Sequence, residues 1–200
     1  MESVEIKTLI KLMSKVPGLG PRSARRAVLT LLQNPKKKMI PLAEMMLKTA
    51  NSIKLCSMCS NIDVHDPCLI CQDDKREHST ICVVEEIADL WAIERTGIYK
   101  GRYYVLGGVL SALDGVRSED LKISQLLNHI NNNSVNEVIL ATSATVAGQT
   151  TSYYILDLLK DKKIKITKLA QGMPMGGELD YLDEGTIGAA LNLRQIINED

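Results

Sequence analysis

Four cysteines lie close together in the chain, in two C-x-x-C pairs separated by eight residues: Cys56, Cys59, Cys68 and Cys71. Two such pairs place four thiolates within reach of one tetrahedral ion, and this ligand set is typical of Zn²⁺. An iron–sulfur cluster and disulfides are the alternatives. Four thiolates leave no open position for a substrate, so we predict a structural zinc ion that supplies folding free energy. His65 lies between the pairs and is able to replace a ligand, but with four cysteines available we predict that it faces solvent.

A second candidate site is the stretch VPGLGPRSARRAV, residues 16–28. Its Pro-Gly-Leu-Gly-Pro turn separates two helical patterns, and the glycines leave backbone N–H groups accessible beside a helix N-terminus. The arginines that follow point away from the apolar stripe of the second helix. This pattern is typical of a helix-hairpin-helix that binds backbone phosphates without reading bases. The predicted DNA contacts are Gly18, Gly20, Arg22, Arg25 and Arg26. A solvated basic patch is the alternative, although positive charge at a helix N-terminus is unfavourable unless an anion binds there.

Charge is distributed unevenly along the chain. Residues 1–55 contain eleven Lys or Arg and three Glu, a net charge of +8, while residues 56–200 carry −8. This asymmetry favours an N-terminal region that faces a polyanion. No stretch approaches the ~20 apolar residues of a membrane span. The N-terminus also lacks the layout of a signal peptide, so we predict a cytoplasmic protein with no membrane contact.

Three amphipathic patterns make residues 1–55 a small helical domain, with Pro35 and the lysines at 36–38 separating the second helix from the third. Beyond the cysteine-rich segment, residues 56–71, short apolar runs alternate with helical patterns. The predicted strands are 81–84, 103–106, 138–141 and 166–170, and the predicted helices lie near 87–96, 118–131 and 149–161. Such alternation predicts a parallel sheet flanked by helices. Cys82, inside the first run, is predicted to be a core residue.

The order of these parts, together with several sequence motifs within them and between them, resembles that of the bacterial RecR family of recombination mediators. The similarity covers nearly the whole chain and rests on LCSMCSNIDVHDPCLIC, ICVVEEIADLWAIERTGIYKGRYYVLGG, LSALDG, EVILAT and GMPMGGELDYLDEGT. It implies a multidomain α/β protein with a helix-hairpin-helix domain (1–55), a four-cysteine zinc finger (56–71), a Toprim-like α/β domain (79–172) and a short C-terminal segment (173–200). Arg22 and Arg26 occupy the basic positions of the family's hairpin motif, and Arg25 is an additional charge.

The resemblance also bears on catalysis. Toprim enzymes bind Mg²⁺ through a Glu after the first strand and an Asp-x-Asp after a later one, and carboxylates are the ligands this ion needs. Glu85 and Glu86 stand where the first Glu belongs, but residues 143–149, SATVAGQ, contain no carboxylate. RecR-like chains usually carry E-G-E where this chain has Ala147-Gly148-Gln149. There is also no P-loop for a nucleotide triphosphate. We therefore predict that the chain is not an enzyme.

The predicted function is that of a DNA-binding recombination mediator in recombinational repair. The family implies that it clamps DNA as a ring-like homotetramer and acts with RecO, and in some settings RecF, to load RecA on gapped single-stranded DNA. The alternative from a different class is a metal-dependent Toprim enzyme, such as a nuclease or a primase-like or topoisomerase-like protein. A third interpretation is a scaffold whose basic end binds an acidic protein and no nucleic acid.

Overall fold

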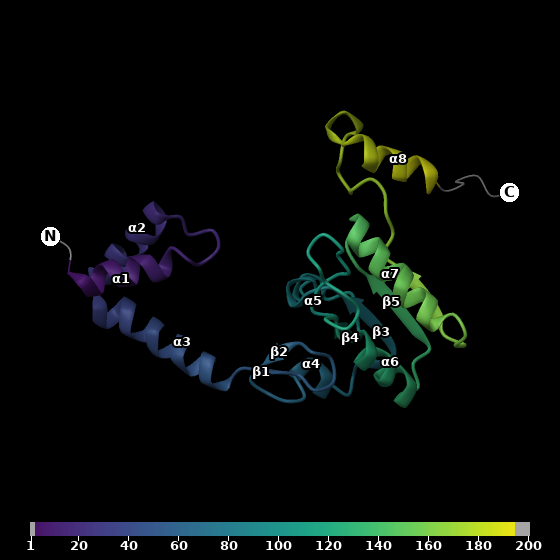
Figure 1. The fold of residues 1–200 in the computed structure, drawn as a ribbon, viewed down its shortest axis with the longest axis horizontal. Coiled ribbons are helices and arrows are strands. Elements are labelled where there is room, and N and C mark those ends of the chain that lie inside the picture. Colours follow the sequence, from purple (N-terminus) through teal and green to yellow (C-terminus); the bar gives the residue numbers. More distant parts are fainter. Residues whose placement is uncertain (1–2, 195–200) are drawn as a thin grey trace. The chain divides into compact units, whose positions relative to one another are not determined.

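The computed structural model describes residues 3–194. The chain divides into two compact units, Met1–Ile53 and Lys54–Asp200 (Figure 1). Within the described residues, no helix combines the length and the apolar character that crossing a bilayer requires.

The N-terminal unit is entirely helical in its described residues (Figure 1). Its elements are α1 (Val4–Met13), α2 (Pro21–Leu32), the π-helical turn η1 (Pro35–Met39) and α3 (Ile40–Ser52). Helices α1 and α2 pack against each other as a hairpin. Ala24 and Val28, on the apolar stripe of α2, are fully buried, as the periodicity of the sequence indicates. The small core of this unit therefore depends on one face of α2.

Two features of this unit differ from the sequence interpretation. The lysine run at 36–38 does not separate two helices, because it forms η1, which continues directly into α3. Asn34 provides the break instead, since its side chain accepts a hydrogen bond from the amide of Lys37 and Pro35 occupies the first helical position. The apolar stripe of α3 is also exposed, with Met45 and Met46 58% and 61% accessible. A helical period alone does not show whether a partner element covers the stripe.

The second unit begins with the cysteine-rich segment. A two-residue strand, β1 (Lys54–Leu55), pairs antiparallel with β2 (Ile62–Asp63), and the short helix α4 (Leu69–Gln72) follows. The amide of Val105, in the edge strand β4 (Gly101–Val105), donates a 2.9 Å hydrogen bond to the carbonyl of Cys59. The segment thus covers part of an edge of the main sheet, which would otherwise present unpaired backbone groups.

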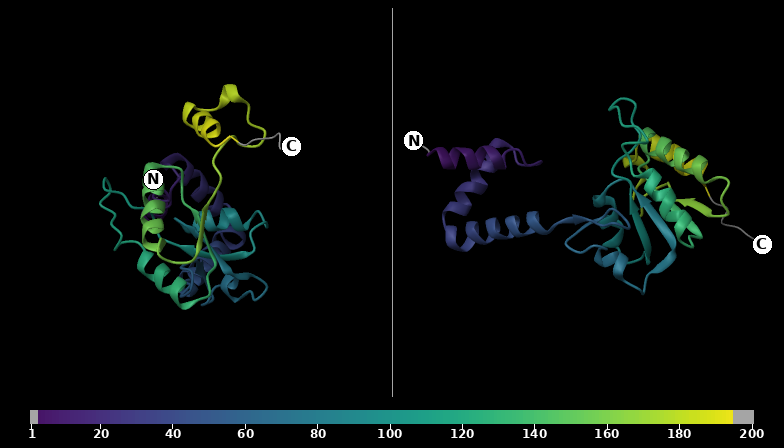
Figure 2. Two further views of the ribbon diagram at one scale, coloured as in Figure 1. Left: turned by 90° about the vertical axis from the view of Figure 1, so that its right-hand side faces the viewer. Right: turned by 60° about the horizontal axis from the view of Figure 1, so that its bottom comes forward.

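Four parallel strands form the main sheet, in the order β4-β3-β5-β6. The remaining strands are β3 (Glu77–Val84), β5 (Glu137–Ala141) and β6 (Lys165–Lys168). Helices α6 (Ile123–Asn132) and α7 (Val146–Leu159) lie side by side on one face, and α5 (Ile87–Glu94) covers the other (Figure 1, Figure 2). The predicted parallel sheet with flanking helices is confirmed.

Element boundaries in this unit depart from the sequence pattern: β3, for example, begins at Glu77 rather than at 81, and two helices also begin at other residues than predicted. Residues 118–122 form turns, so α6 begins only at Ile123. Helix α7 begins at Val146, earlier than the pattern indicated, because Thr145 caps it by accepting a hydrogen bond from the amide of Gly148. Cys82 is buried in the sheet as predicted, and this burial raises the pKa of its thiol to about 12. The described part of the chain ends with a short 3-10 turn, η2 (Leu179–Tyr181), and helix α8 (Glu184–Asn192).

Candidate nucleic-acid interface and metal centre

The four cysteines of the C-x-x-C pairs converge on one point. The Sγ atoms of Cys56, Cys59, Cys68 and Cys71 all lie within 4.8 Å of one another, and all four residues are buried. Sulfur atoms that surround a zinc ion tetrahedrally, each at ~2.3 Å, are separated by about 3.8 Å. The Sγ atoms of Cys59 and Cys68 are 3.5 Å apart, close to that separation. The donor set and its spacing fit one Zn²⁺ ion.

Backbone hydrogen bonds hold the two cysteine pairs in this arrangement. The amide of Cys68 donates to the sulfur of Cys56 at 3.3 Å, which ties the second pair to the first. Asp66 accepts from the amide of Ser57 at 2.7 Å, and Asp63 accepts from the amide of Leu69 at 2.9 Å. The second of these bonds is the main reason why the pKa of Asp63 is lowered. These carboxylates connect the loop between the pairs to both knuckles.

The thiols influence one another strongly. Hydrogen bonds from Cys59 and then Cys71 lower the pKa of Cys68, while the pKa of Cys59 is raised, first by its bond to Cys68 and also by burial. Zn²⁺ binds thiolates, so a bound ion would hold all four sulfurs in the deprotonated form. His65 is exposed and lies outside the sulfur cluster, as the sequence analysis predicted. The cluster is therefore closed, and a bound ion would supply folding free energy without contacting a substrate.

The turn between α1 and α2 is open to solvent. Gly18 adopts a φ of +80°, a left-handed conformation that favours glycine. A Cβ atom at Gly18 or Gly20 would meet nothing within 4 Å, so the space beside both glycines is open. Gly20 is the N-cap of α2 and has no side chain with which to cap it. The backbone at this point is available to an incoming group.

Four backbone amides at the start of α2 have no acceptor within residues 3–194. None of these residues accepts a hydrogen bond from the N–H groups of Gly18, Gly20, Arg22 or Ser23, whereas the amide of Ala24 begins the helical ladder by donating to Gly20. Unpaired N–H groups at a helix N-terminus form a binding site for anions, phosphates included. The helix has no acidic residue in its first turn to occupy that site.

The three arginines of α2 lie on its exposed face. Arg22, Arg25 and Arg26 are all exposed; Arg22 and Arg26 point away from the buried Ala24 and Val28, and Arg25 lies at the flank of that stripe. The structure therefore brings all five residues predicted to contact DNA to one end of a single helix. Sequence reasoning identified the glycines and arginines but did not identify the amide of Ser23. The absence of a capping side chain at Gly20 was the feature of the sequence that indicated this free amide.

The carboxyl end of the main sheet is the position at which a Toprim enzyme holds its metal ion. Glu85 follows β3, and its Oε1 atom accepts a 2.6 Å hydrogen bond from the amide of Ser143, which follows β5. Glu86 caps α5 in a reciprocal arrangement with Asp89. Both acids at the predicted metal position thus hold backbone groups of the chain itself. In the described part of the chain, the four cysteines are the one cluster of three or more possible metal ligands.

Gly148 is closely surrounded at this end of the sheet. A Cβ atom there would lie 2.4 Å from the carbonyl oxygen of Ser143 and 2.7 Å from Oε1 of Glu85. Only glycine fits this position without displacing the backbone. Ala147 and Gln149 on either side carry no charge, and the amide group of Gln149 donates to the carbonyl of Ala144 at 3.0 Å.

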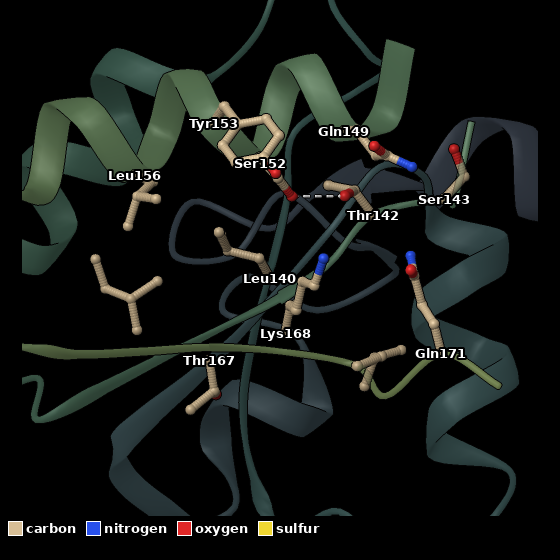
Figure 3. Close-up of a pocket in the computed structure, with 12 residues that line it drawn as sticks. Leu140, Thr142, Ser143, Gln149, Ser152, Tyr153, Leu156, Thr167, Lys168 and Gln171 are labelled. Atoms are coloured by element: carbon tan, nitrogen blue, oxygen red, sulfur yellow. Dashed lines mark hydrogen bonds between the residues drawn. The ribbon is translucent and has the colours of Figure 1, made fainter. Parts of the chain in front are cut away.

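A pocket of about 160 Å³ opens beside this end of the sheet, between α7 and the strands β5 and β6 (Figure 3). Within its lining, the hydroxyl groups of Thr142 and Ser152 are hydrogen-bonded to each other, with their oxygens 2.7 Å apart. None of its twelve lining residues is Asp or Glu, so the pocket offers no carboxylate to a metal ion. Lys168 contributes the one charged side chain of the lining, which the sequence pattern did not single out.

Comparison with known proteins covers each part of the chain. Residues 6–50 match the family model of the RecR helix-hairpin-helix, residues 53–73 that of the RecR four-cysteine zinc finger domain, residues 79–170 that of the Toprim domain, and residues 172–195 that of the RecR C-terminal region. The chain is 54% identical over 191 residues to Recombination protein RecR of Cereibacter sphaeroides. It is 52% and 54% identical over 193 residues to the proteins of the same name from Rhizobium meliloti and Maricaulis maris. Each alignment covers 96% of both chains.

Proposed function

Because the chain belongs to the RecR family of recombination proteins, we propose that it acts as a non-enzymatic mediator that clamps DNA during recombinational repair. The recombination role follows from the family, whereas the manner of DNA binding is our proposal. In it, the turn between α1 and α2 binds phosphates of the DNA backbone without reading the sequence of bases.

The open N-terminus of α2 is the observation that carries this proposal. The four backbone amides at the start of α2, which have no acceptor among the described residues, are available to donate to one phosphate. The exposed guanidinium groups of Arg22 and Arg26, one helical turn apart, are available to the neighbouring phosphates. Arg25 extends the same positive surface. Contacts to phosphates carry no sequence information, so a site built from these groups supports binding that is independent of sequence.

The second unit supports a role without catalysis. Its four-cysteine site is closed, and Glu85 and Glu86 are hydrogen-bonded to backbone amides of the chain. A magnesium ion bound by so few carboxylates would keep nearly all of its water molecules. We therefore assign this unit to structure and to binding, with zinc stabilising its N-terminal segment.

The proposal includes partners and assembly. By analogy with the family, the chain forms a ring-like homotetramer in the cytoplasm and acts with RecO and RecF to load RecA on gapped single-stranded DNA. The exposed apolar stripe of α3 is consistent with self-association, because a helix that leaves such a stripe uncovered gains stability when another surface covers it.

The experiment that tests the hairpin is a titration of fluorescent gapped duplex DNA over a salt series, with and without a RecO-type partner. It compares the wild type with Arg22→Ala/Arg26→Ala. Each phosphate contact contributes about 0.9 to the slope of log K against log salt, so the double variant should lower this slope by roughly two. The matched control is Lys7→Ala/Lys11→Ala, which removes the same charge from exposed positions one turn apart on α1.

An equal loss of slope in both double variants would indicate general attraction by a basic unit and would contradict a specific hairpin contact. Unchanged affinity in the arginine variant would show that DNA binds elsewhere. If the wild type binds an acidic partner protein but no nucleic acid under any of these conditions, the scaffold interpretation replaces the mediator.

A further inference from the structure

The pocket between α7 and β6 has the position and composition of a ligand site. Ligands of open parallel α/β sheets bind at the carboxyl ends of the strands, and this pocket lies beside the ends of β5 and β6. Figure 3 shows the ammonium group of Lys168 and the amide groups of Gln149 and Gln171 directed into the space under α7. Polar groups from a strand, a helix and the segment that follows β6 thus converge on one small volume.

The charge of the pocket favours an anion. Lys168 makes no ion pair with any described residue, whereas Lys165, three residues earlier on the same strand, pairs with Glu137 at 3.2 Å. The lining contains no acid. Asp183 lies in the adjoining groove, but its carboxylate is engaged as the cap of α8, where it accepts from the amide and the hydroxyl of Thr186. A phosphate beside Lys168 would also find the hydroxyl of Thr142 in the lining.

The opposite side of the pocket is apolar and aromatic. Tyr153 lines it and is 65% exposed, so one face of its ring is accessible. Leu156 and Ile166 lie further along the lining, while the amide of Gln171 offers a donor and an acceptor; the amide nitrogen of Gln149 already donates to Ala144. A base stacks on such a ring whatever its identity, because every base has a π-face. A cation on one side can bind the phosphate of a nucleotide, and an accessible aromatic ring on the other can stack on its base.

We propose that this pocket binds one nucleotide of single-stranded DNA, with its phosphate at Lys168 and its base against Tyr153. The inference rests on the proposed DNA-binding function and extends it, because it adds a contact within residues 54–194 that selects single strands. A base paired in duplex DNA is stacked between its neighbours and does not enter a pocket of this kind. The hairpin contact, which involves only the backbone, makes no such distinction.

Photocrosslinking tests the location directly. An oligothymidylate that carries one 5-iododeoxyuridine is irradiated with the full-length wild-type protein, and the crosslinked peptides are identified by mass spectrometry. The expected product is the peptide that contains Tyr153. Crosslinks confined to residues outside the pocket lining would overturn the proposal. Crosslinks to Tyr153 that persist in Arg22→Ala/Arg26→Ala would separate the pocket from the hairpin, so that failure of the one does not hide the other.

Binding titrations with single-stranded and blunt duplex DNA provide the second test. Tyr153→Ala should weaken single-strand binding at least about fivefold, because stacking on an aromatic ring is worth ~1–3 kcal/mol per base. Lys168→Gln should reduce the single-strand salt slope by about 0.7. Neither variant should alter duplex binding, and Tyr153→Phe should retain affinity because it keeps the ring. Lys165→Gln is the matched control, with the same charge change on the same strand.

Each contrary result would point to a different role for the pocket or its residues. Equal losses in Lys168→Gln and Lys165→Gln would show a general electrostatic effect and overturn the proposal. Unchanged DNA binding together with lost self-association would overturn it by assigning the pocket to a protein contact. An increase in melting temperature on adding thymidine monophosphate but not an oligonucleotide would overturn it in favour of a free nucleotide. Circular dichroism and melting temperature establish that each variant is folded.

Discussion

The N-termini of α2 and α7 present the same backbone groups to their surroundings, but the chain occupies only one of them. At α7, Thr145 caps the helix, and the carboxylate of Glu85 accepts the amide of Ser143 just before it. At α2, the cap is Gly20, which has no side chain, and the amides of Gly18 and Gly20 have no acceptor among the described residues. An unpaired backbone N–H group carries a free-energy penalty when it is buried away from water. The turn before α2 is open to solvent, so its donors avoid this penalty and remain available to a binding partner.

This difference also shows how a residue at a metal-binding position can have a structural role instead. In a metal-dependent Toprim enzyme, the carboxylate after the first strand serves an ion. Here Glu85 joins the ends of β3 and β5, and Ala147 and Gln149 beside it carry no charge. The acidic position after β3 is thus occupied by the chain itself, while the hairpin and the cysteines depend on a group from outside.

Loss of zinc should have the largest effect on folding, because no other group in the described part of the chain can replace the ion that links the four buried thiols. Cys68→Ser is expected to abolish zinc binding and to unfold the segment between β1 and α4, which gathers little apolar burial of its own. Metal analysis and limited proteolysis measure both effects. His65→Ala is the control and should keep a full complement of zinc. Normal metal content in Cys68→Ser would contradict a four-cysteine site.

Gly148→Ala should be the next most damaging change. Its Cβ would stand 2.4 Å from the carbonyl oxygen of Ser143, which forces the backbone to move and lowers the free energy of unfolding by about 1–3 kcal/mol. Thermal unfolding measures the loss. Gly188→Ala, in α8, is the matched control, because its added methyl group would meet nothing within 4 Å and should raise stability by about 0.5–1 kcal/mol. A stable Gly148→Ala variant would show that the sheet end is looser than described.

The sequence predicted most of what depends on local patterns. Residue spacing identified the zinc ligands, and alternating apolar runs predicted the parallel sheet, because a buried strand must be apolar on both faces. The glycines and arginines of the hairpin were likewise visible in the sequence. The division into four segments and the DNA contacts themselves stay predictions.

The missed features depend on contacts between distant residues. The bond between Glu85 and Ser143 spans 58 positions, and no local pattern indicates it. Lys168 differs from Lys165 only in what surrounds it, so no sequence pattern separates a paired lysine from one that lines a pocket. The π-helical turn at Pro35–Met39 was missed because a lysine run is typical of a loop, whereas the cap at Asn34 allows it to continue into α3.

Glu85→Gln should have a smaller effect than Gly148→Ala. The amide keeps the shape of the side chain and an acceptor for Ser143, but it loses the charge that strengthens the 2.6 Å hydrogen bond. We expect a decrease of about 1 kcal/mol in the free energy of unfolding. Chemical denaturation measures this decrease, with Glu119→Gln as the control, since Glu119 pairs with Arg117 at an exposed position and should contribute almost nothing. DNA affinity should not change, and a large loss of affinity would indicate that Glu85 serves a bound ligand.

The smallest change in stability is expected from Gly20→Ser, which gives α2 the kind of cap that α7 already has. Gly20 has the extended backbone of an N-cap, and its added Cβ would meet nothing within 4 Å. A serine hydroxyl there can accept from the amide of Arg22 or Ser23 and should stabilise the helix by a few tenths of a kcal/mol. The same hydrogen bond removes a donor from the phosphate site, so we expect roughly tenfold weaker DNA binding in the salt titration.

The Gly20→Ser variant distinguishes two explanations of DNA binding by the hairpin, which removal of the arginines does not distinguish. Gly20→Ser keeps Arg22, Arg25 and Arg26, so a purely electrostatic patch would bind DNA with unchanged affinity and an unchanged salt slope. If the backbone amides are phosphate ligands, affinity falls although the helix is more stable and every arginine is present. Gly20→Asp should weaken binding further, because its carboxylate would occupy the open helix end much as Glu85 holds the amide before α7. A stabilised Gly20→Ser variant with wild-type affinity would remove the amides of Arg22 and Ser23 from the interface and leave the arginines and the amides of Gly18 and Gly20 as the DNA contact.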